Sequence, residues 1–279
     1  MTLPPGASVL ARVGGGDINE AYRVRLSDGR EAFVKTRAEA SPQEYEAEAA
    51  GLRWLSEPGA LRTPVVLEID ARYLALEWID PAPSGRLEAE GVEELGRGLA
   101  ATHLAGAGCF GAPDGAAARF GSLGLSNEPA PDWATFYGER RLAPLGQLAR
   151  ERGALGGASL AALERVCERL ADLTGPPESP ARLHGDLWSG NVMAGADGRP
   201  WLIDPSAYGG HREVDLAMLR LFGAPSERVF DAYEEVAPLA EGWRERVDLY
   251  QLLPLLVHAL LFGGSYCAAA ERVVSRYGA

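Results

Sequence analysis

Apolar and polar residues alternate along several short segments in the first eighty residues. Residues 8–13, 21–26 and 31–36 show the pattern, and a Ser-Asp-Gly-Arg turn separates the last two segments. Residues 65–69 and 73–78 have the same character. Alternation with a period of two is typical of strands that bury one face. The pattern therefore predicts a small antiparallel sheet in this region.

One helix is expected to interrupt that sheet. Ser41 is a favourable N-cap, Pro42 suits the first helical position, and Glu44 stands three residues after the cap. The helix should run from there to about residue 55. The inward face of this helix can be located from the spacing of its apolar residues.

A carboxylate lies inside the apolar stripe of this helix. At 100° per residue, Glu48 falls within the stripe, whereas Glu44 and Glu46 fall at its two edges. A carboxylate on a buried face needs a cation, so Glu48 is predicted to pair with one, unless it is a solvated glutamate on a slightly misplaced face. The apolar stripe itself consists of Tyr45, Ala49, Leu52 and Leu55.

The pattern becomes mainly helical after the breaker cluster at residues 81–85. Helical spacing is found at 87–105, 133–152, 160–173, 228–236 and 242–277, the last with possible breaks at Pro254 and at Gly263-Gly264. An Asp-Gly turn at 197–198 predicts a hairpin within residues 182–205. We therefore expect an α+β protein with two lobes, residues 1–80 and 81–279.

Composition and charge exclude several classes of function. The chain has 279 residues with 27 Lys and Arg against 39 Asp and Glu, which gives a net charge of −12. An acidic surface repels a phosphate backbone, so no nucleic-acid partner is expected. The three cysteines form neither a disulfide framework nor a metal-binding motif. With no signal peptide or membrane span recognisable, a cytoplasmic protein with no membrane partner is expected.

The segment His-Gly-Asp-Leu-Trp-Ser-Gly-Asn at 184–191 places Asp186 and Asn191 five residues apart, as in the catalytic loop of protein kinases. Phosphoryl transfer needs a carboxylate that accepts the proton of the attacking hydroxyl and an oxygen ligand for Mg²⁺. Asp186 is predicted to be the base, and Asn191 and Asp204 to be metal ligands. An isolated Asp and Asn at this spacing more often form an Asx turn with a helix cap than a catalytic loop, but the hairpin and Asp204 favour a phosphotransferase.

The N-terminal region supplies the other groups that a kinase cleft requires. Lys35 ends a predicted strand, from which its ammonium could reach ATP phosphates, with Glu48 as its anchor. Glu77, Trp78 and Ile79 occupy the position of an adenine-binding hinge, although a plain edge strand would look the same. A glycine-rich turn could approach the phosphates through its backbone N–H groups, or simply turn the chain; it comprises Gly14, Gly15, Gly16, Asp17, Ile18 and Asn19.

Several segments together carry a resemblance to a known family. They are residues 15–19 with 33–35, W-x-x-F-Y-x-E-R-R-L at 133–142, residues 184–191, the run 203–218 ending in Y-G-G-H-R-E-x-D-L-A-M, and residues 260–264. On these segments, and over nearly the whole chain, the sequence resembles the fructosamine kinase (ketosamine 3-kinase) family. This branch is similar to the aminoglycoside phosphotransferases and choline kinases, so the resemblance implies a two-lobed protein-kinase-like fold.

The resemblance also implies a reaction. Members phosphorylate, with ATP and Mg²⁺, the 3-hydroxyl of ketosamines, which are adducts of reducing sugars with amines such as protein lysine. The unstable 3-phosphate then releases the free amine, so the role would be deglycation repair. On this match Asp186 is the base, Asn191 and Asp204 hold magnesium, Lys35 with Glu48 orients phosphates, and Asp215 steadies the catalytic loop.

Some assignments stay open at this point. Trp188 could stack on the sugar or pack against the lobe, and His211 could touch substrate or, more plausibly, cap a helix. The acceptor could instead be an aminoglycoside, choline or another metabolite hydroxyl, or the chain could be a nucleotide-binding pseudokinase that acts as an interaction module. Some relatives cross-link through a cysteine in the glycine loop, where this chain has Asp17, so a monomer or weak homodimer without that disulfide is expected.

Overall fold

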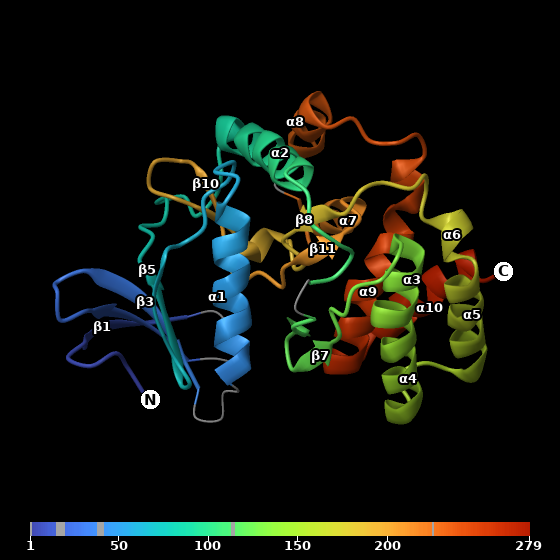
Figure 1. The fold of residues 1–279 in the computed structure, drawn as a ribbon, viewed down its shortest axis with the longest axis horizontal. Coiled ribbons are helices and arrows are strands. Elements are labelled where there is room, and N and C mark those ends of the chain that lie inside the picture. The colour runs from blue at the N-terminus through green and yellow to red at the C-terminus, as the bar shows by residue number, and fades with distance from the viewer. Residues whose placement is uncertain (1, 15–19, 38–41, 113–114, 225) are drawn as a thin grey trace.

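The protein is described by a computed structural model that covers residues 2–14, 20–37, 42–112, 115–224 and 226–279. A β-rich region formed by the start of the chain lies at the left of Figure 1, and a mainly helical region lies at the right. Helix α1 stands between the sheet and the rest of the molecule. This arrangement confirms the predicted α+β class.

The described residues of the N-terminal region form an antiparallel sheet of five strands in the order β1-β2-β3-β5-β4. Its central strand β3 pairs with β2 and β5, so that Lys35 lies opposite Ala21 and Leu74. All the predicted strands are present to within one residue. Their bounds are β1 Ser8–Val13, β2 Glu20–Arg25, β3 Glu31–Thr36, β4 Val66–Asp70 and β5 Tyr73–Glu77.

Helix α1 (Pro42–Ser56) packs against one face of this sheet. The predicted stripe is buried, since Tyr45, Ala49 and Leu52 form a cluster with Leu74 and Leu76 of β5. Val34 belongs to a separate cluster with other strand residues. Because neighbouring strand residues point to opposite faces, Lys35 points toward α1. The predicted cap Ser41 lies outside the described residues.

The C-terminal region is built mainly from helices around two apolar clusters. Helix α2 packs on α8, and α9 lies against α4, α7 and α10. Within the described residues, no helix combines the length and apolar character that crossing a membrane requires. The bounds are α2 Ala89–Leu104, α3 Trp133–Tyr137, a π-helical turn Gly138–Leu142, α4 Ala143–Arg152, α5 Gly157–Glu168, α6 Leu170–Leu173, α7 Glu213–Leu221, α8 Arg228–Val236, α9 Trp243–Phe262 and α10 Ser265–Tyr277.

Three pairs of short antiparallel strands lie in the described part of the C-terminal region, and two of them flank the catalytic loop. The predicted hairpin is present as β9 (Val192–Ala194) and β10 (Pro200–Leu202). Strand β8 (Ala181–Leu183) enters the loop and pairs with β11 (Tyr208–Gly210), while β6 (Ala118–Phe120) pairs with β7 (Leu123–Leu125). The alternation analysis missed β6, β7, β8 and β11, because three-residue strands are too short for a period of two to be visible.

The predicted break at Pro254 is wrong, whereas the one at Gly263-Gly264 is present. Helix α9 runs through Pro254, which is buried in the middle of it. Proline removes one helical hydrogen bond, but the apolar residues around it, from Leu252 to Leu256, are buried and hold the helix in place. At the second position both glycines have positive φ, +66° and +61°, which most other residues avoid.

Candidate active site

Three charged side chains meet between the two lobes. Lys35 of β3 places its Nζ 2.8 Å from Glu48 Oε1 of α1 and 2.5 Å from Asp204 Oδ1, which follows β10. The Lys35 and Glu48 side chains are only 8% and 16% exposed, whereas that of Asp204 is 44% exposed. The cation is therefore fixed by two carboxylates, one from each half of the chain, at the edge of a solvent-accessible space.

The charge state of Lys35 follows from this geometry. Burial alone would lower the pKa of the ammonium, because it removes the charge from water. Glu48 and Asp204 outweigh that effect and raise the pKa above its ordinary value. Lys35 therefore remains a permanent positive charge at neutral pH, as an anchor for phosphate oxygens requires.

Asp186 and Asn191 occupy the other wall. The Asn191 side-chain amide donates to the backbone oxygen of Asp186 at 2.8 Å and to its Oδ2 at 3.2 Å. Burial raises the pKa of Asp186 to about 7; the hydrogen bond from Asn191 opposes this shift, and the charges of Asp204 and Asp215 add to it. A carboxyl whose pKa lies near neutrality can both accept and release a proton.

Asp204 has a strained backbone. Its φ is +56°, and among the described residues it is the one non-glycine residue with a positive φ. Such conformations cost roughly 1–3 kcal/mol and persist where the surroundings enforce them, often at functional sites. Here the surroundings are the Ile203 N–H bond to Asn191 O at 3.1 Å and the contact with Lys35.

A buried carboxylate holds the backbone of the catalytic loop from behind. Asp215 of α7 is fully buried and accepts hydrogen bonds from the N–H groups of His184, at 2.7 Å, and Gly185, at 2.9 Å. Gly185 has φ +81°, and a Cβ there would stand 2.0 Å from the carbonyl oxygen of Ser206, so only glycine fits. The implied position of Asp215 behind the loop matches these contacts.

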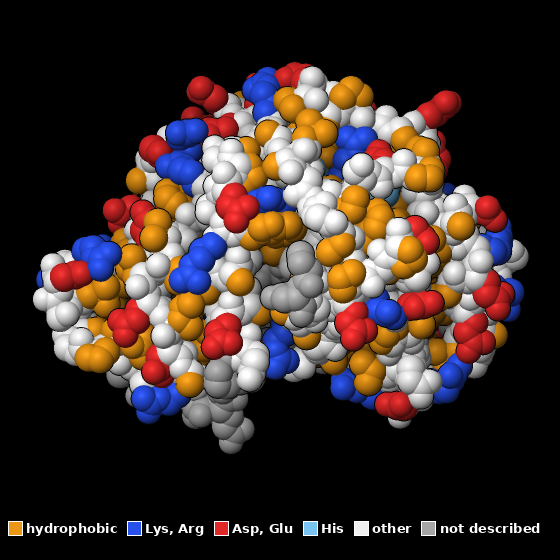
Figure 2. Space-filling model, in the orientation of Figure 1, with side chains coloured by type: hydrophobic (Ala, Val, Ile, Leu, Met, Phe, Trp, Pro, Cys, Tyr) orange, Lys and Arg blue, Asp and Glu red, His pale blue; other side chains and the backbone are white. Residues whose placement is uncertain are grey.

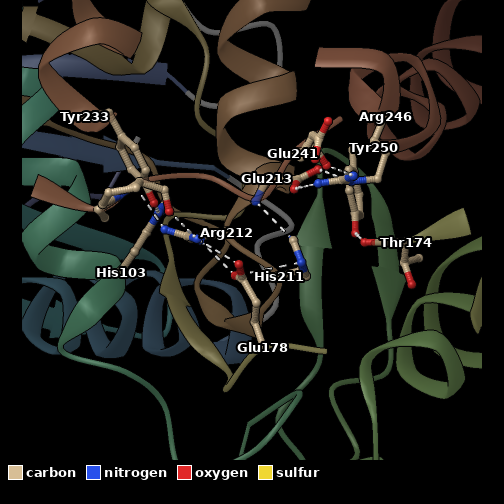
Figure 3. A network of polar contacts seen from close by, with 12 residues as sticks. His103, Thr174, Glu178, His211, Arg212, Glu213, Tyr233, Glu241, Arg246 and Tyr250 are labelled. Carbon is tan, nitrogen blue, oxygen red and sulfur yellow. Dashed lines mark hydrogen bonds and ion pairs between the residues drawn. The ribbon is translucent and has the colours of Figure 1, made fainter. Parts of the chain in front are cut away.

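The support continues through a polar network that includes His103, Tyr233, Arg212 and Glu178 (Figure 3). His103 of α2 contacts Asp215 Oδ2 through Nε2 at 3.2 Å and the Tyr233 hydroxyl through Nδ1 at 2.8 Å. Because the carboxylate only accepts, Nε2 carries the proton and Nδ1 accepts from Tyr233. Arg212, which precedes α7, forms a two-bond ion pair with Glu178 at 2.7 and 2.8 Å.

Lys35, Glu48, Asp186 and Asp204 all line one cleft of about 460 Å³. The far wall includes Arg37 and Glu44 from the N-terminal region and Arg119 and Asn127 from the segment around β6 and β7. On the face drawn in Figure 2, acidic and basic side chains are interspersed over both halves of the molecule. The sequence prediction that the charged residues of the two halves share one space thus agrees with the geometry.

Among the residues that the structure describes, Gly14, Glu77, Trp78 and Ile79 do not line this cleft. Gly14 is exposed, with open space around it, whereas Gly15, Gly16, Asp17, Ile18 and Asn19 lie outside the described residues. In the predicted hinge, Glu77 accepts a hydrogen bond from the Val65 N–H and the Trp78 indole donates to Asp80, while Ile79 is half-buried. The adenine-binding role of Glu77, Trp78 and Ile79 therefore stays a prediction.

The two residues with alternative roles differ in exposure. Trp188 is 39% exposed and sits edge-on against Phe222, so its ring is accessible on the outside of the catalytic loop. His211 is 3% exposed, stacks on Tyr250 and accepts from the Glu213 N–H at 3.3 Å. The bond from the Glu213 N–H fits the capping interpretation of His211, and the contact with substrate stays a prediction.

Sequence reasoning missed several residues at the site. Arg141 is fully buried between Phe136 and Tyr208, and its guanidinium donates to Asn127 Oδ1 at 2.5 Å, which fixes one wall of the cleft. His103 could have been found from the helical wheel, because it follows Leu95 and Leu99 at intervals of four on the buried face. Arg141 follows Trp133 and Tyr137 at the same interval of four, so the helical spacing could have indicated its burial as well.

The donor atoms fit a magnesium ion. Because the Asn191 amide nitrogen is used toward Asp186, its oxygen is the atom left to coordinate, together with a carboxylate oxygen of Asp204. No group of three or more His, Cys, Asp or Glu with metal-binding geometry occurs among the described residues. Mg²⁺ commonly takes one or two protein oxygens and completes its shell with phosphates and water, which is the set available here.

Comparisons with known proteins show which family the chain resembles. A family model described as fructosamine kinase matches residues 6–278. A probable ketoamine kinase of Thermus thermophilus is 37% identical over 261 residues, covering 94% of this chain and 91% of the relative. A chloroplastic protein-ribulosamine 3-kinase of Arabidopsis thaliana is 34% identical over 276 residues, covering 96% and 82%.

A solved structure supports the fold. The crystal structure of a candidate fructosamine-3-kinase from Thermobifida fusca superposes with a TM-score of 0.89 at 45% sequence identity, covering 98% of this chain and 93% of that one. The expected protein-kinase-like architecture is thereby confirmed, as a small sheet-containing region and a larger helical region with the charged cleft between them.

Proposed function

The chain belongs to the fructosamine kinase family, and from this premise we propose that it uses ATP and Mg²⁺ to phosphorylate the 3-hydroxyl of a ketosamine. The acceptor would be a fructosamine or ribulosamine adduct, either free or on a protein lysine. Because a ketosamine 3-phosphate is unstable and releases its amine, the biological role would be deglycation.

One observation carries the proposal. Lys35 and Glu48 converge with Asp186, Asn191 and Asp204 although Lys35 and Asp204 are 169 residues apart in the sequence. A chance pairing of surface charges would not hold a buried ammonium between carboxylates from two lobes. The arrangement contains the cation, the base and the oxygen ligands that phosphoryl transfer requires.

Each residue has a distinct task in this reaction. Asp186 accepts the proton of the acceptor's 3-hydroxyl while the hydroxyl oxygen bonds to the γ-phosphorus of ATP and ADP leaves. The pKa of Asp186, near 7, suits this proton transfer. Lys35, held by Glu48, binds phosphate oxygens. Asn191 and Asp204 would hold magnesium, which when bound neutralises negative charge on the phosphates.

The first experiment measures ATP consumption with fructosyl-lysine, ribulosyl-lysine, choline and kanamycin as separate acceptors. We expect turnover with the two ketosamines and none above background with choline or kanamycin. Asp186→Asn should lower kcat by about 10²–10⁴-fold without changing the fold, because it removes the base and keeps its shape.

The result also separates the alternatives. Turnover only with choline or kanamycin would show that the proposed acceptor is wrong and that the protein is still a phosphotransferase. ATP binding without turnover of any acceptor would favour an interaction module. Unchanged activity in Asp186→Asn would show that Asp186 is not the base.

A further inference from the structure

A second group of charges joins the two walls of the cleft where α1 begins. Glu44 lies one helical turn before Glu48 on α1 and forms ion pairs with two arginines. Arg37, directly after β3, contacts Oε2 of Glu44, and Arg119 of β6 contacts Oε1 at 2.6 Å. Figure 1 shows β7, the partner strand of β6, beside the end at which α1 begins. Each oxygen of the Glu44 carboxylate therefore has its own cation.

The contacts between β3 and α1 repeat with matched spacing. Lys35 and Arg37 are two residues apart at the end of β3, a spacing that in an extended chain places side chains on one side. Glu48 and Glu44 are four residues apart, so they lie on one face of the helix. Lys35 binds Glu48 and Arg37 binds Glu44, so two parallel ion pairs join the strand to the helix.

Arg119 connects this arrangement to the C-terminal region. Its side chain is 33% exposed and that of Glu44 is 20% exposed, so their contact is partly shielded from water. A single exposed ion pair contributes little, but a partly buried carboxylate that binds two guanidinium groups is restrained by both. Arg119 therefore restrains the start of α1 relative to the lobe that carries the catalytic loop.

The position of α1 matters because this helix carries the anchor of Lys35. Among the described residues, the carboxylate partners of the Lys35 ammonium are Glu48 and Asp204. When Asp204 holds a metal ion, as proposed, Glu48 is the partner that remains. A shift of α1 would then move the ammonium away from the phosphate oxygens that it is proposed to bind.

We infer that Arg119 is a positioning residue for ATP. By holding Glu44 it fixes the start of α1, so that Glu48 keeps Lys35 directed at the phosphates. The inference rests on the proposed function, because it takes Lys35 as the phosphate-binding cation. Arg119 acts through Glu44 and needs no contact with the nucleotide, which distinguishes it from an arginine that binds phosphate directly.

The test measures the dissociation constant of ATP in the presence of Mg²⁺ by isothermal titration calorimetry. Arg119→Ala and Glu44→Gln should each raise the Kd about 3-fold to 10-fold. The double variant should bind ATP no more weakly than Glu44→Gln alone, since both changes break the same contact. Arg119→Lys keeps the cation and should retain the wild-type Kd within about twofold.

Glu44→Gln separates the inferred role from the alternative one, because the two roles predict opposite signs. An arginine that bound phosphate itself, or acted only through its charge, would be released when Glu44 is neutralised, and ATP would bind more tightly. Tighter binding in Glu44→Gln, or an unchanged Kd in both Glu44→Gln and Arg119→Ala, would therefore overturn the inference.

The matched control is Asp197→Asn, which removes another ion pair between the two halves of the chain, that of Asp197 with Arg62 at 2.9 Å. This variant should leave the Kd for ATP within about twofold, and an equal rise in it would also overturn the inference.

The acceptor supplies a second readout. KM for fructosyl-lysine should stay within about twofold in Arg119→Ala, whereas general loosening of the fold would change this KM and the melting temperature together with the Kd and would contradict a positioning role. Each of these failures would leave the proposed function intact. A wild-type protein that binds ATP but phosphorylates no ketosamine would instead overturn the proposed function, and the comparison of Kd values would still test Arg119.

Discussion

The catalytic loop at residues 184–191 is supported in opposite ways on its two sides. On the inner side, the fully buried Asp215 binds two backbone N–H groups and is itself held by the buried His103. On the outer side, Trp188 is 39% exposed and meets Phe222 edge-on. Directional hydrogen bonds fix the loop on its inner side, whereas a ring contact supports it on its outer side.

The two sides of the loop differ in how precisely their side chains must be positioned. A base must stand within hydrogen-bond distance of the proton that it accepts, so its backbone must be fixed. A ring that stacks on a sugar needs only contact area, which several arrangements provide. Substitutions on the inner side should therefore change stability and kcat, whereas those on the outer side should change mainly KM.

The largest effect is expected for Asp215→Asn. The asparagine side chain keeps one oxygen that can accept a hydrogen bond, but its NH2 group would face the second backbone N–H of the loop, which it cannot bind. We therefore expect a loss of about 3 kcal/mol in the free energy of unfolding. Displacement of the loop should lower kcat about 10²-fold. Urea unfolding and steady-state kinetics measure both. The control is Asp248→Asn, a 44% exposed carboxylate paired with Arg276, which should change neither by a measurable amount.

A smaller effect is expected from pH through His211, which lies in the same supporting layer. Burial lowers the pKa of His211 to about 4, and the Glu178 carboxylate 3.8 Å away opposes the shift. Since the unfolded chain has an ordinary histidine pKa near 6.5, the contribution of His211 is complete above that pH and is lost as pH falls toward 4.

His211→Asn tests this contribution, because asparagine keeps an acceptor for the Glu213 N–H but does not titrate. Between pH 7.5 and pH 5, the wild type should lose about 2 kcal/mol more stability than the variant. Equal losses in the two proteins, measured by urea unfolding at each pH, would show that His211 does not remain neutral in the folded state.

The smallest effect on stability belongs to the outer side. Trp188→Phe should change the free energy of unfolding by less than about 0.5 kcal/mol, because the ring is partly exposed. It should raise KM for a ketosamine roughly twofold to fivefold, because the smaller ring offers less area for the predicted stacking on the sugar. A drop in kcat with unchanged KM would mean that the ring positions the loop, and the contrast between the two sides would fail.

The sequence allowed the elements to be predicted wherever a periodic pattern was long enough. The five strands of the sheet, the inward face of α1 and the hairpin before Asp204 all followed from local spacing. The short strands around the catalytic loop and the unbroken course of α9 through Pro254 did not, because they depend on pairing and packing with distant segments.

The residues of the candidate site also differ in whether they could be predicted from the sequence. Asp186, Asn191 and Asp204 were recognisable from their spacing, and Glu48 from its position on a helical wheel. The contacts of Arg141 with Tyr208 and of Trp188 with Phe222 were not, because the two partners lie on different elements. The roles assigned to these residues remain predictions that the experiments above test.

By itself, the sequence determined which residues are chemically able to act and on which kind of element each one lies, since a periodic pattern is encoded within a few neighbouring residues. Only the tertiary structure decided that Lys35 meets Asp204 and that Asp215 holds the loop. Those contacts join segments far apart in the chain, and packing of whole elements, which no local pattern records, brings them together.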